Sequence, residues 1–222
     1  MPRRARKKPA FRSPPGANSQ HTKRAILDAA REEFAEKGFA GTRIDAIAKS
    51  ARINKQALYY HFGSKERLYS AVLEDGYSAI YASIYQRIGE LNLASLTPTE
   101  VVKALAETFF DKMMEFPQIL EIISDENKYQ GVHLREFGSI RTVTQPFISD
   151  LRRALKKGSE DGSFRSRLDP VHVWISIVSV CQFWWHHRYT LSHILDDEIA
   201  IANFTRTRRK HVIDFILAAL RR

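Results

Sequence analysis

The sequence predicts an all-α fold with an N-terminal three-helix helix-turn-helix domain, a C-terminal helical domain and about nine helices in all. Apolar residues recur at intervals of three and four in successive segments, and residues typical of helix starts and stops separate these segments. Beyond Leu68 there is no alternating strand pattern, no glycine-rich strand boundary and no internal repeat. The 222 residues are 44% hydrophobic and 27% charged, which excludes disorder throughout.

Several classes of protein are excluded by what the chain lacks. The longest near-continuous apolar run, Val173 to Trp185, is shorter than the roughly 20 residues of a membrane span. The basic N-terminus has no apolar stretch after its charges, and the single cysteine, Cys181, leaves no intramolecular disulfide. No spaced Cys/His set and no glycine-rich phosphate loop occurs. We therefore expect a cytoplasmic protein with no membrane partner, no metal and no other cofactor.

The net charge of +10 is concentrated at the N-terminus. Residues 1–63 contain 14 Lys/Arg and 5 Asp/Glu, whereas the remaining residues contain 21 and 20. This distribution predicts an N-terminal segment that binds a polyanion, with nucleic acid ahead of a membrane surface. Residues 1–19, rich in Arg, Lys and Pro, are predicted to be a flexible basic arm. The arm is either a solvated tail or a segment that follows phosphates or enters a minor groove.

Residues 20–66 are predicted to form the helix-turn-helix domain. The first helix begins at Thr22, carries apolar residues every fourth position and stops at Gly38. The second begins at Thr42, whose hydroxyl is expected to cap it. The third begins at Asn54 as N-cap and runs to Phe62. Two short helices joined by a tight turn are typical of a helix-turn-helix.

A helical wheel separates two faces of the third helix. The inward face, beside Ile53, contains Ala57, Leu58 and His61. The outward face contains Lys55, Gln56, Tyr59 and Tyr60. Lys and Gln read guanine and adenine edges in a major groove, and Tyr contacts methyl groups or phosphates. The alternative is that the tyrosines pack beneath another part of the chain.

Several motifs between Thr22 and Leu68 carry a family resemblance. They are Ile-Leu-x-Ala-Ala-x-x-x-Phe-x-x-x-Gly-Phe from Ile26, then Ile47-Ala48, Leu58-Tyr59-Tyr60-His61-Phe62 and Ser64-Lys65-Glu66-x-Leu68. This stretch resembles the DNA-binding domain of the TetR family of bacterial transcriptional regulators. The resemblance implies phosphate contacts from the second helix and from the end of the third, and base contacts in between. The predicted DNA-binding residues are Thr42, Arg43, Asn54, Lys55, Gln56, Tyr59, Tyr60, His61 and Lys65.

The turn departs from the family pattern. Where the family commonly has Ala-Gly-Val, this chain has Ala51-Arg52-Ile53. If the middle position needs a positive φ, an arginine there costs about 1 kcal/mol relative to glycine. Arg52 is then either a tolerated turn residue or a further phosphate contact.

Residues 67–222 are predicted to form a helical effector-binding and dimerisation domain. Helices are expected from Ser64 to about Glu90, after the Thr97–Glu100 capping box, over about 117–127 and 133–158, after Asp169-Pro170, and over about 197–220.

The helix after Asp169 is apolar almost all round and needs partners on two sides. With the last helix it is predicted to form a two-fold dimer interface, as the resemblance also implies. The predicted interface residues are Phe183, Val212, Phe215 and Ile216. The alternative is a monomer with a thick core.

An aromatic pocket between helices is the predicted effector site. Its predicted residues are Tyr77, Tyr81, Phe109, Met113, Trp174 and Trp185, although residues of this kind also form ordinary core. Phe116-Pro117-Gln118 and Leu168-Asp169-Pro170-x-His172 resemble the pyrimidine-utilisation repressor group of the same family, without identifying the ligand.

The chain is not expected to be an enzyme. His186 and His187 are adjacent and so face different sides of a helix, and Cys181 lies among apolar neighbours, where a thiol is inert. We expect a sequence-specific dimeric regulator that represses from a palindromic operator and responds to a small-molecule effector. The alternative is an architectural or nucleoid-associated DNA binder of the same fold without an effector.

Overall fold

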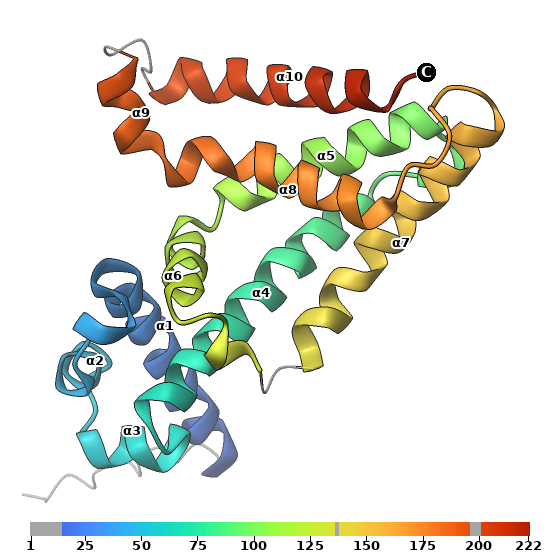
Figure 1. Cartoon of the computed structure of the whole chain (residues 1–222). Coiled ribbons are helices and arrows are strands. Elements are labelled where there is room, and N and C mark those ends of the chain that lie inside the picture. The colour runs from blue at the N-terminus through green and yellow to red at the C-terminus, as the bar shows by residue number, and fades with distance from the viewer. Residues whose placement is uncertain (1–14, 136–137, 196–200) are drawn as a thin grey trace, which may run out of the picture.

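The described chain is built of helices, which form a small N-terminal domain and a larger C-terminal body. The computed structural model describes residues 15–135, 138–195 and 201–222, and these ranges contain ten α-helices, two 3-10 turns and no strand. Helices α1 to α3 gather at one end, and α8 and α10 lie at the other (Figure 1). The predicted all-α class is confirmed. No described helix combines the length and the apolar character that crossing a membrane would require.

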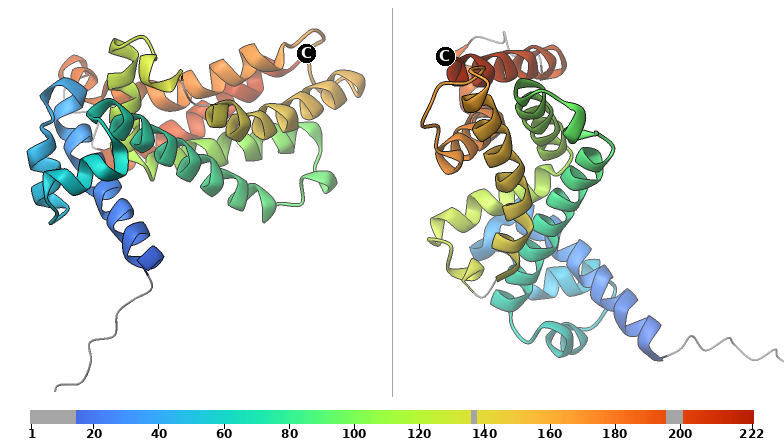
Figure 2. Two further views of the ribbon diagram at one scale, coloured as in Figure 1. Left: turned by 90° about the horizontal axis from the view of Figure 1, so that it is seen from below. Right: turned by 90° about the vertical axis from the view of Figure 1, so that its right-hand side faces the viewer.

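The N-terminal domain comprises α1 (Pro15–Gly41), α2 (Ile44–Ser50) and α3 (Lys55–Phe62). Helix α1 begins at Pro15, so residues 15–19 belong to this helix and not to the predicted arm, and residues 1–14 lie outside the described part of the chain. Figure 2 shows the first turns of α1 extending away from the body. The buried residues of this domain include Ile26, Ala30, Phe34, Ile47 and Leu58, at the helical spacing that the sequence predicts.

Gly38 interrupts α1 as predicted, but a further turn follows it as far as Gly41. Gly38 has φ 67° and ψ 176°, and a Cβ there would lie 3.1 Å from the carboxylate oxygens of Asp125 in α6. The Phe39 N–H after the kink donates to Asp125 Oδ2 at 2.7 Å. A carboxylate of the body therefore satisfies a backbone group that the break in α1 releases.

The described part of the body contains seven α-helices. They are α4 (Lys65–Gly89), α5 (Pro98–Met114), α6 (Pro117–Lys128), α7 (Gly138–Glu160), α8 (Pro170–His186), α9 (Arg188–Ile194) and α10 (Ile201–Leu220), with 3-10 turns at Leu93–Ser95 and Val132–Leu134. Helix α9 was not predicted; it separates from α8 at His187, which has φ −107° and ψ 10°. Helix α7 begins later than predicted because Gly131, with φ 68°, and the second 3-10 turn precede it.

Local hydrogen bonds explain the helix starts that the sequence predicts correctly. Ser64 accepts from the Arg67 N–H, and Thr97 with Glu100 forms a complete capping box. Asp169 accepts from the N–H groups of Val171 and His172. Each cap satisfies backbone donors that the first helical turn leaves unpaired.

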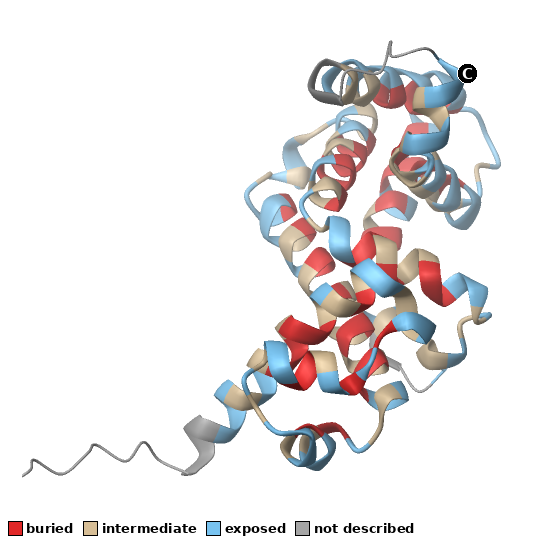
Figure 3. Cartoon of the chain, turned by 90° about the vertical axis from the view of Figure 1, so that its left-hand side faces the viewer, coloured by how far each residue is buried: buried red, intermediate tan, exposed pale blue. Residues whose placement is uncertain are grey.

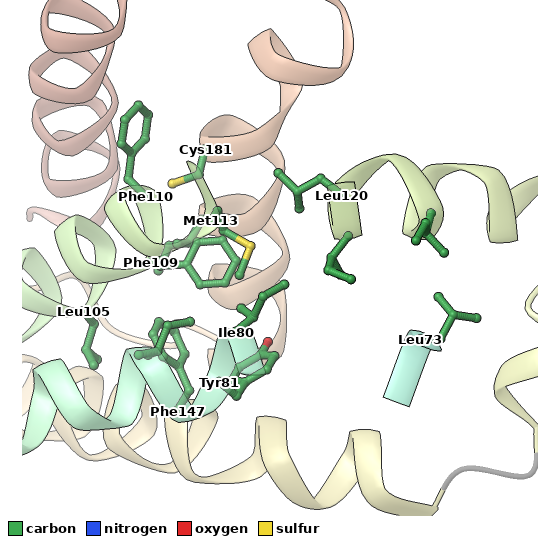
Figure 4. Packing of buried hydrophobic residues seen from close by; sticks show 14 of the residues in the cluster. Leu73, Ile80, Tyr81, Leu105, Phe109, Phe110, Met113, Leu120, Phe147 and Cys181 are labelled. Atoms are coloured by element: carbon green, nitrogen blue, oxygen red, sulfur yellow. The ribbon is translucent and has the colours of Figure 1, made fainter. Parts of the chain in front are cut away.

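The core lies where α4, α5 and α7 meet, and it continues beneath α8 and α10. Buried residues form a continuous band along the inner sides of these helices (Figure 3). Figure 4 shows side chains from α4, α5 and α7 converging, and the rings of Phe109 and Phe147 are 5.8 Å apart. Helices α4 and α6 approach closely at Gly76, where a Cβ would lie 2.5 Å from Ile119 Cδ1. Only a residue without a side chain fits this crossing.

Candidate DNA interface and effector cavity

Helix α3 presents the outward face that the wheel predicts. Leu58 is fully buried and Phe62 nearly so, whereas Lys55 and Gln56 are exposed. Tyr59 is 42% exposed and Tyr60 85%. The alternative that these tyrosines pack beneath another part of the chain is therefore wrong. Ala57 and His61 are half-buried, and the Tyr60 and His61 rings meet edge to face.

The turn before α3 places Arg52 in the left-handed conformation. Arg52 has φ 56°, its N–H donates to Lys49 O at 3.1 Å, and the Ile53 N–H donates to Ala48 O at 3.0 Å. This pair of bonds is a Schellman motif, which usually has glycine at the left-handed position. The two bonds satisfy carbonyls at the end of α2 and help offset the cost of the arginine. Asn54 caps α3 by accepting from the Ala57 N–H at 2.7 Å.

Thr42 does not occupy the position that the sequence predicts. It is only 2% exposed, and its hydroxyl donates to Gly38 O at 2.8 Å and to Glu33 O at 3.0 Å. The N-cap of α2 is Arg43, which makes no capping hydrogen bond with its side chain. The prediction that the Thr42 hydroxyl caps α2 is wrong, because α2 begins at Ile44 with Arg43 as its N-cap, and the hydroxyl bonds to α1. The Arg43 side chain is exposed.

Lys55, at the start of α3, is paired with an acid that the sequence interpretation passed over. Its Nζ lies 3.0 Å from Asp45 Oδ1, and both side chains are largely exposed. Asp45 lies in the first turn of α2, where a negative charge is favourable. The pair links α2 to α3 and gives the Lys55 ammonium a partner in the absence of DNA.

Lys65 anchors α4 to the end of α1. Its Nζ donates to Thr42 O at 2.5 Å and lies 4.8 Å from the centre of the Phe39 ring. Partial burial lowers the pKa of Lys65. The ammonium has one hydrogen-bond acceptor among the described residues, so two of its donors remain for a phosphate.

Two buried acids on α6 form a polar cluster against α1 and α4. Asp125 accepts from the Phe39 N–H, and the Tyr69 hydroxyl lies 3.4 Å from its Oδ2. Glu126 accepts from the His133 N–H at 2.8 Å, and its Oε2 lies 2.7 Å from His133 Nδ1. Burial and these carboxylates raise the pKa of Tyr69 well above its usual range. The sequence analysis did not single out Asp125 or Glu126, because their partners lie on other helices.

A cavity of about 250 Å³ lies between α4, α5, α6, α7 and α8. Five of the six predicted effector residues line it: Tyr77, Tyr81, Phe109, Met113 and Trp174. Figure 4 shows Ile80, Tyr81, Phe109 and Met113 directed toward one another from α4 and α5. The remaining lining residues are Ile80, Ile123, Ile140, Thr144, Val178 and Gln182. The sequence did not single out Gln182 as a lining residue, because an isolated glutamine in an apolar helix carries no positional signal.

The polar groups of this cavity are uncharged. Burial and the nearby Glu126 carboxylate raise the pKa of Tyr77 to about 12, and burial raises the pKa of Tyr81. Gln182 Nε2 lies 3.2 Å from Met113 Sδ, a weak acceptor. The indole N–H of Trp174 is buried beside the Tyr81 hydroxyl without reaching good hydrogen-bond geometry. These groups leave hydrogen-bonding capacity inside the cavity.

Trp185, the sixth predicted effector residue, lies elsewhere. The Arg188 guanidinium is 4.2 Å from its ring centre, and Arg188 also pairs with Glu121 at 2.9 Å. Trp185 follows the cavity-lining Gln182 by three residues, but α8 ends at His186 and the indole packs at that end of the helix. Its contact is with α9 and not with the cavity.

Several large apolar side chains are exposed on α8 and α10. Val171, Ile175 and Phe183 are exposed along one stripe of α8, and Phe215 is exposed on α10. A hollow of about 520 Å³, larger than the effector cavity, lies beside them between α8, α10 and the segment before α8. Two predicted interface residues, Val212 and Ile216, are instead 1% and 5% exposed within the chain's own core. Their side chains are therefore not on the outer surface, and that prediction is wrong for both.

Comparison with known proteins agrees with this architecture. Residues 26–72 match the family of bacterial regulatory proteins named tetR, and residues 98–216 match the tetracyclin repressor-like C-terminal domain. The chain is 32% identical over 204 residues to the HTH-type transcriptional repressor NicS of Pseudomonas putida, covering 92% of this chain and 94% of NicS. The chain belongs to the TetR family.

Other matches differ in how much of the chain they cover. The HTH-type transcriptional repressor SCO4008 of Streptomyces coelicolor is 53% identical over only 53 residues, 24% of this chain and 28% of its own length. The crystal structure of the transcriptional regulator SCO4942 from Streptomyces coelicolor superposes with a TM-score of 0.66 at 25% identity, covering 90% of this chain and 98% of that one. The protein is thus a DNA-binding transcriptional regulator and not an enzyme. The finer likeness to pyrimidine-utilisation repressors stays a prediction.

Proposed function

We propose that this TetR-family protein is a repressor that binds a palindromic operator as a homodimer and releases it when a small-molecule effector occupies the body. The observation that carries the proposal is the exposed face of α3, where Lys55, Gln56, Tyr59 and Tyr60 stand clear of the chain's own core. The name of NicS, a transcriptional repressor, supports the sign of regulation. Such a regulator acts on the nucleoid in the cytoplasm.

The DNA contacts divide by chemistry. Lys55, Gln56 and Tyr59 are proposed to reach base edges, since they lie toward the start of the exposed face. Arg43, Tyr60, His61 and Lys65 are proposed to hold phosphates on either side. Thr42 is proposed to act indirectly, because its hydroxyl and N–H bond to α1 and its carbonyl accepts from the Lys65 ammonium. Asn54 acts by capping α3, which orients the helix.

The apolar outer face of α8 and α10 is proposed as the two-fold interface. Phe183 and Phe215 are 51% and 55% exposed there, and Val171 and Ile175 extend the same surface. Exposed apolar patches of this kind mark sites of association. A two-fold axis between the bodies places two α3 helices for half-sites about one DNA turn apart.

Effector response is proposed to pass through α6. Ile123 of α6 lines the cavity, and two residues further on Asp125 holds the Phe39 N–H at the kink of α1. A ligand that shifts α6 therefore acts on α1 through a direct hydrogen bond. Changing the separation of the two recognition helices removes the advantage of binding both half-sites together.

Selection of bound sequences from a random duplex pool at near-physiological salt tests the DNA function. We expect an enriched palindrome with half-sites about one turn apart. Binding without enrichment would instead favour an architectural, nucleoid-associated protein. Sedimentation of the free protein tests the homodimer, and Phe183→Glu together with Phe215→Glu should give a folded monomer.

A further inference from the structure

The cavity between α4 and α8 is specific enough in size and charge to indicate what it binds. We propose that the effector is an uncharged aromatic molecule of one or two rings with a polar substituent, bound within this cavity. The inference rests on the proposed effector function and adds the chemical class of the ligand.

The volume sets the size of the ligand. A cavity of about 150 Å³ holds benzene, which has six heavy atoms. The present cavity of about 250 Å³ therefore accommodates about ten, the size of a two-ring molecule. Larger ligands would need the walls to move, and those walls include the fully buried Ile80 and Phe109.

The walls set the shape of the ligand. Tyr77, Tyr81, Phe109 and Trp174 supply aromatic rings from three helices, α4, α5 and α8. Aromatic rings pair favourably in offset and edge-to-face arrangements. A planar ring is thus the ligand that gains most contact from these side chains.

The uncharged lining of the cavity favours an uncharged ligand. The titratable groups among the described lining residues are the phenols of Tyr77 and Tyr81, and burial raises their pKa further above neutrality. A carboxylate placed here would lose its hydration and find no cation to replace it. Glu126 is the acid whose charge raises the pKa of the lining residue Tyr77, and its carboxylate is already bonded to His133. An ammonium ligand would therefore also lack a free counter-ion.

The polar substituent has a specific partner. The Gln182 amide points to Met113 sulfur in the absence of a ligand, and its nitrogen gains a stronger bond from any oxygen or ring-nitrogen acceptor. Gln182 and Tyr77 are therefore the residues that orient the ring. Another polar group of the lining, Thr144, lies on α7.

The test uses three probes of one ring system: 2-naphthol, 2-naphthoate and 2-naphthylmethylammonium. Each is titrated into the full-length protein by calorimetry and by thermal denaturation. We expect 2-naphthol to bind with a dissociation constant at least about tenfold lower than either ion, because the ions must be buried unpaired. Gln182→Leu should weaken 2-naphthol binding about fivefold, because it removes the hydrogen bond to the hydroxyl.

A matched pair of variants locates the binding site. Val178→Phe fills the cavity, so it should abolish 2-naphthol binding while the protein still unfolds cooperatively. Val132→Phe places the same ring at an exposed position and should leave binding unchanged.

The possible failures are distinguishable. If 2-naphthoate or the ammonium binds as tightly as 2-naphthol or more tightly, the proposal of an uncharged ligand is wrong, although the cavity remains a candidate effector site. Binding that Val178→Phe does not affect overturns the site. No binding by any probe overturns this inference, while the sequence-selection experiment tests the DNA-binding function separately.

Discussion

Removing the Lys65 side chain should weaken both the fold and DNA binding, by amounts that the structure sets. Lys65→Ala deletes a charge-assisted hydrogen bond to Thr42 O, worth about 1.5–3 kcal/mol, and a cation–π contact with Phe39, worth about 0.5–1 kcal/mol. Because Lys65 is partly exposed, we take the lower end, about 2 kcal/mol. For a chain of this size that lowers the melting temperature by roughly 4–8 °C.

The same change should remove one phosphate interaction from each protomer. The slope of log binding constant against log salt should become shallower by about 0.9 for each phosphate that is no longer neutralised, or by about 1.8 for a dimer on its operator. The decrease in affinity should be similar for operator and random duplex, since an interaction with phosphate carries no sequence information.

Fluorescence anisotropy with a labelled duplex at several salt concentrations measures the slope, and thermal denaturation measures stability. Lys65→Met controls for lost packing, because it keeps an apolar stem over Phe39 but removes the ammonium with its hydrogen bond and charge. Lys103→Ala, at an exposed position of α5, is the control and should change neither quantity. An unchanged salt slope in Lys65→Ala would refute the phosphate contact, and an unchanged melting temperature would refute the anchoring role.

Three further predictions follow from buried and exposed groups. Tyr59→Ala should relax operator specificity with a smaller effect on random DNA, measured as the ratio of the two affinities; an unchanged ratio would show that Tyr59 does not read bases. Gly76→Ala should cost about 1–3 kcal/mol in chemical denaturation because its Cβ would overlap Ile119, whereas Gly89→Ala, with open space around it, should not destabilise the protein. Burial raises the pKa of Cys181 to about 12, so the native protein should react with a disulfide reagent such as dithionitrobenzoate only on unfolding; rapid stoichiometric reaction of the folded protein would contradict this.

The elements that sequence predicted best are those whose cause is local. Asn54, Ser64 and the Thr97–Glu100 capping box each bond to backbone groups within three residues, so nearby residue types suffice to place them. The exposed face of α3 follows from helical periodicity, and the positive φ of Arg52 from the tight turn. These features also place the DNA-binding surface on the chain.

Contacts between residues of different helices were decided by the tertiary structure and could not be read from local sequence. The Thr42 hydroxyl was expected to cap α2, but α2 has Arg43 as its N-cap, and the Thr42 hydroxyl bonds to carbonyl oxygens of α1. Asp125 holds a backbone group 86 residues away, at a separation that no local pattern reports. Periodicity grouped Val212 and Ile216 with Phe215, but only packing determines which side of α10 faces its own chain.

The effector cavity shows both contributions in one place. The sequence supplied its aromatic residues, since large rings at helical spacing are conspicuous, and five of the six predicted residues converge there. The sequence did not show that Gln182 lines the cavity or that the lining carries no charge, because five helices must come together before their side chains enclose a volume. Local sequence thus determined the helices and the exposed face of α3, whereas long-range packing decided the cavity, its chemistry and the contact of α6 with α1, since those properties exist only between helices.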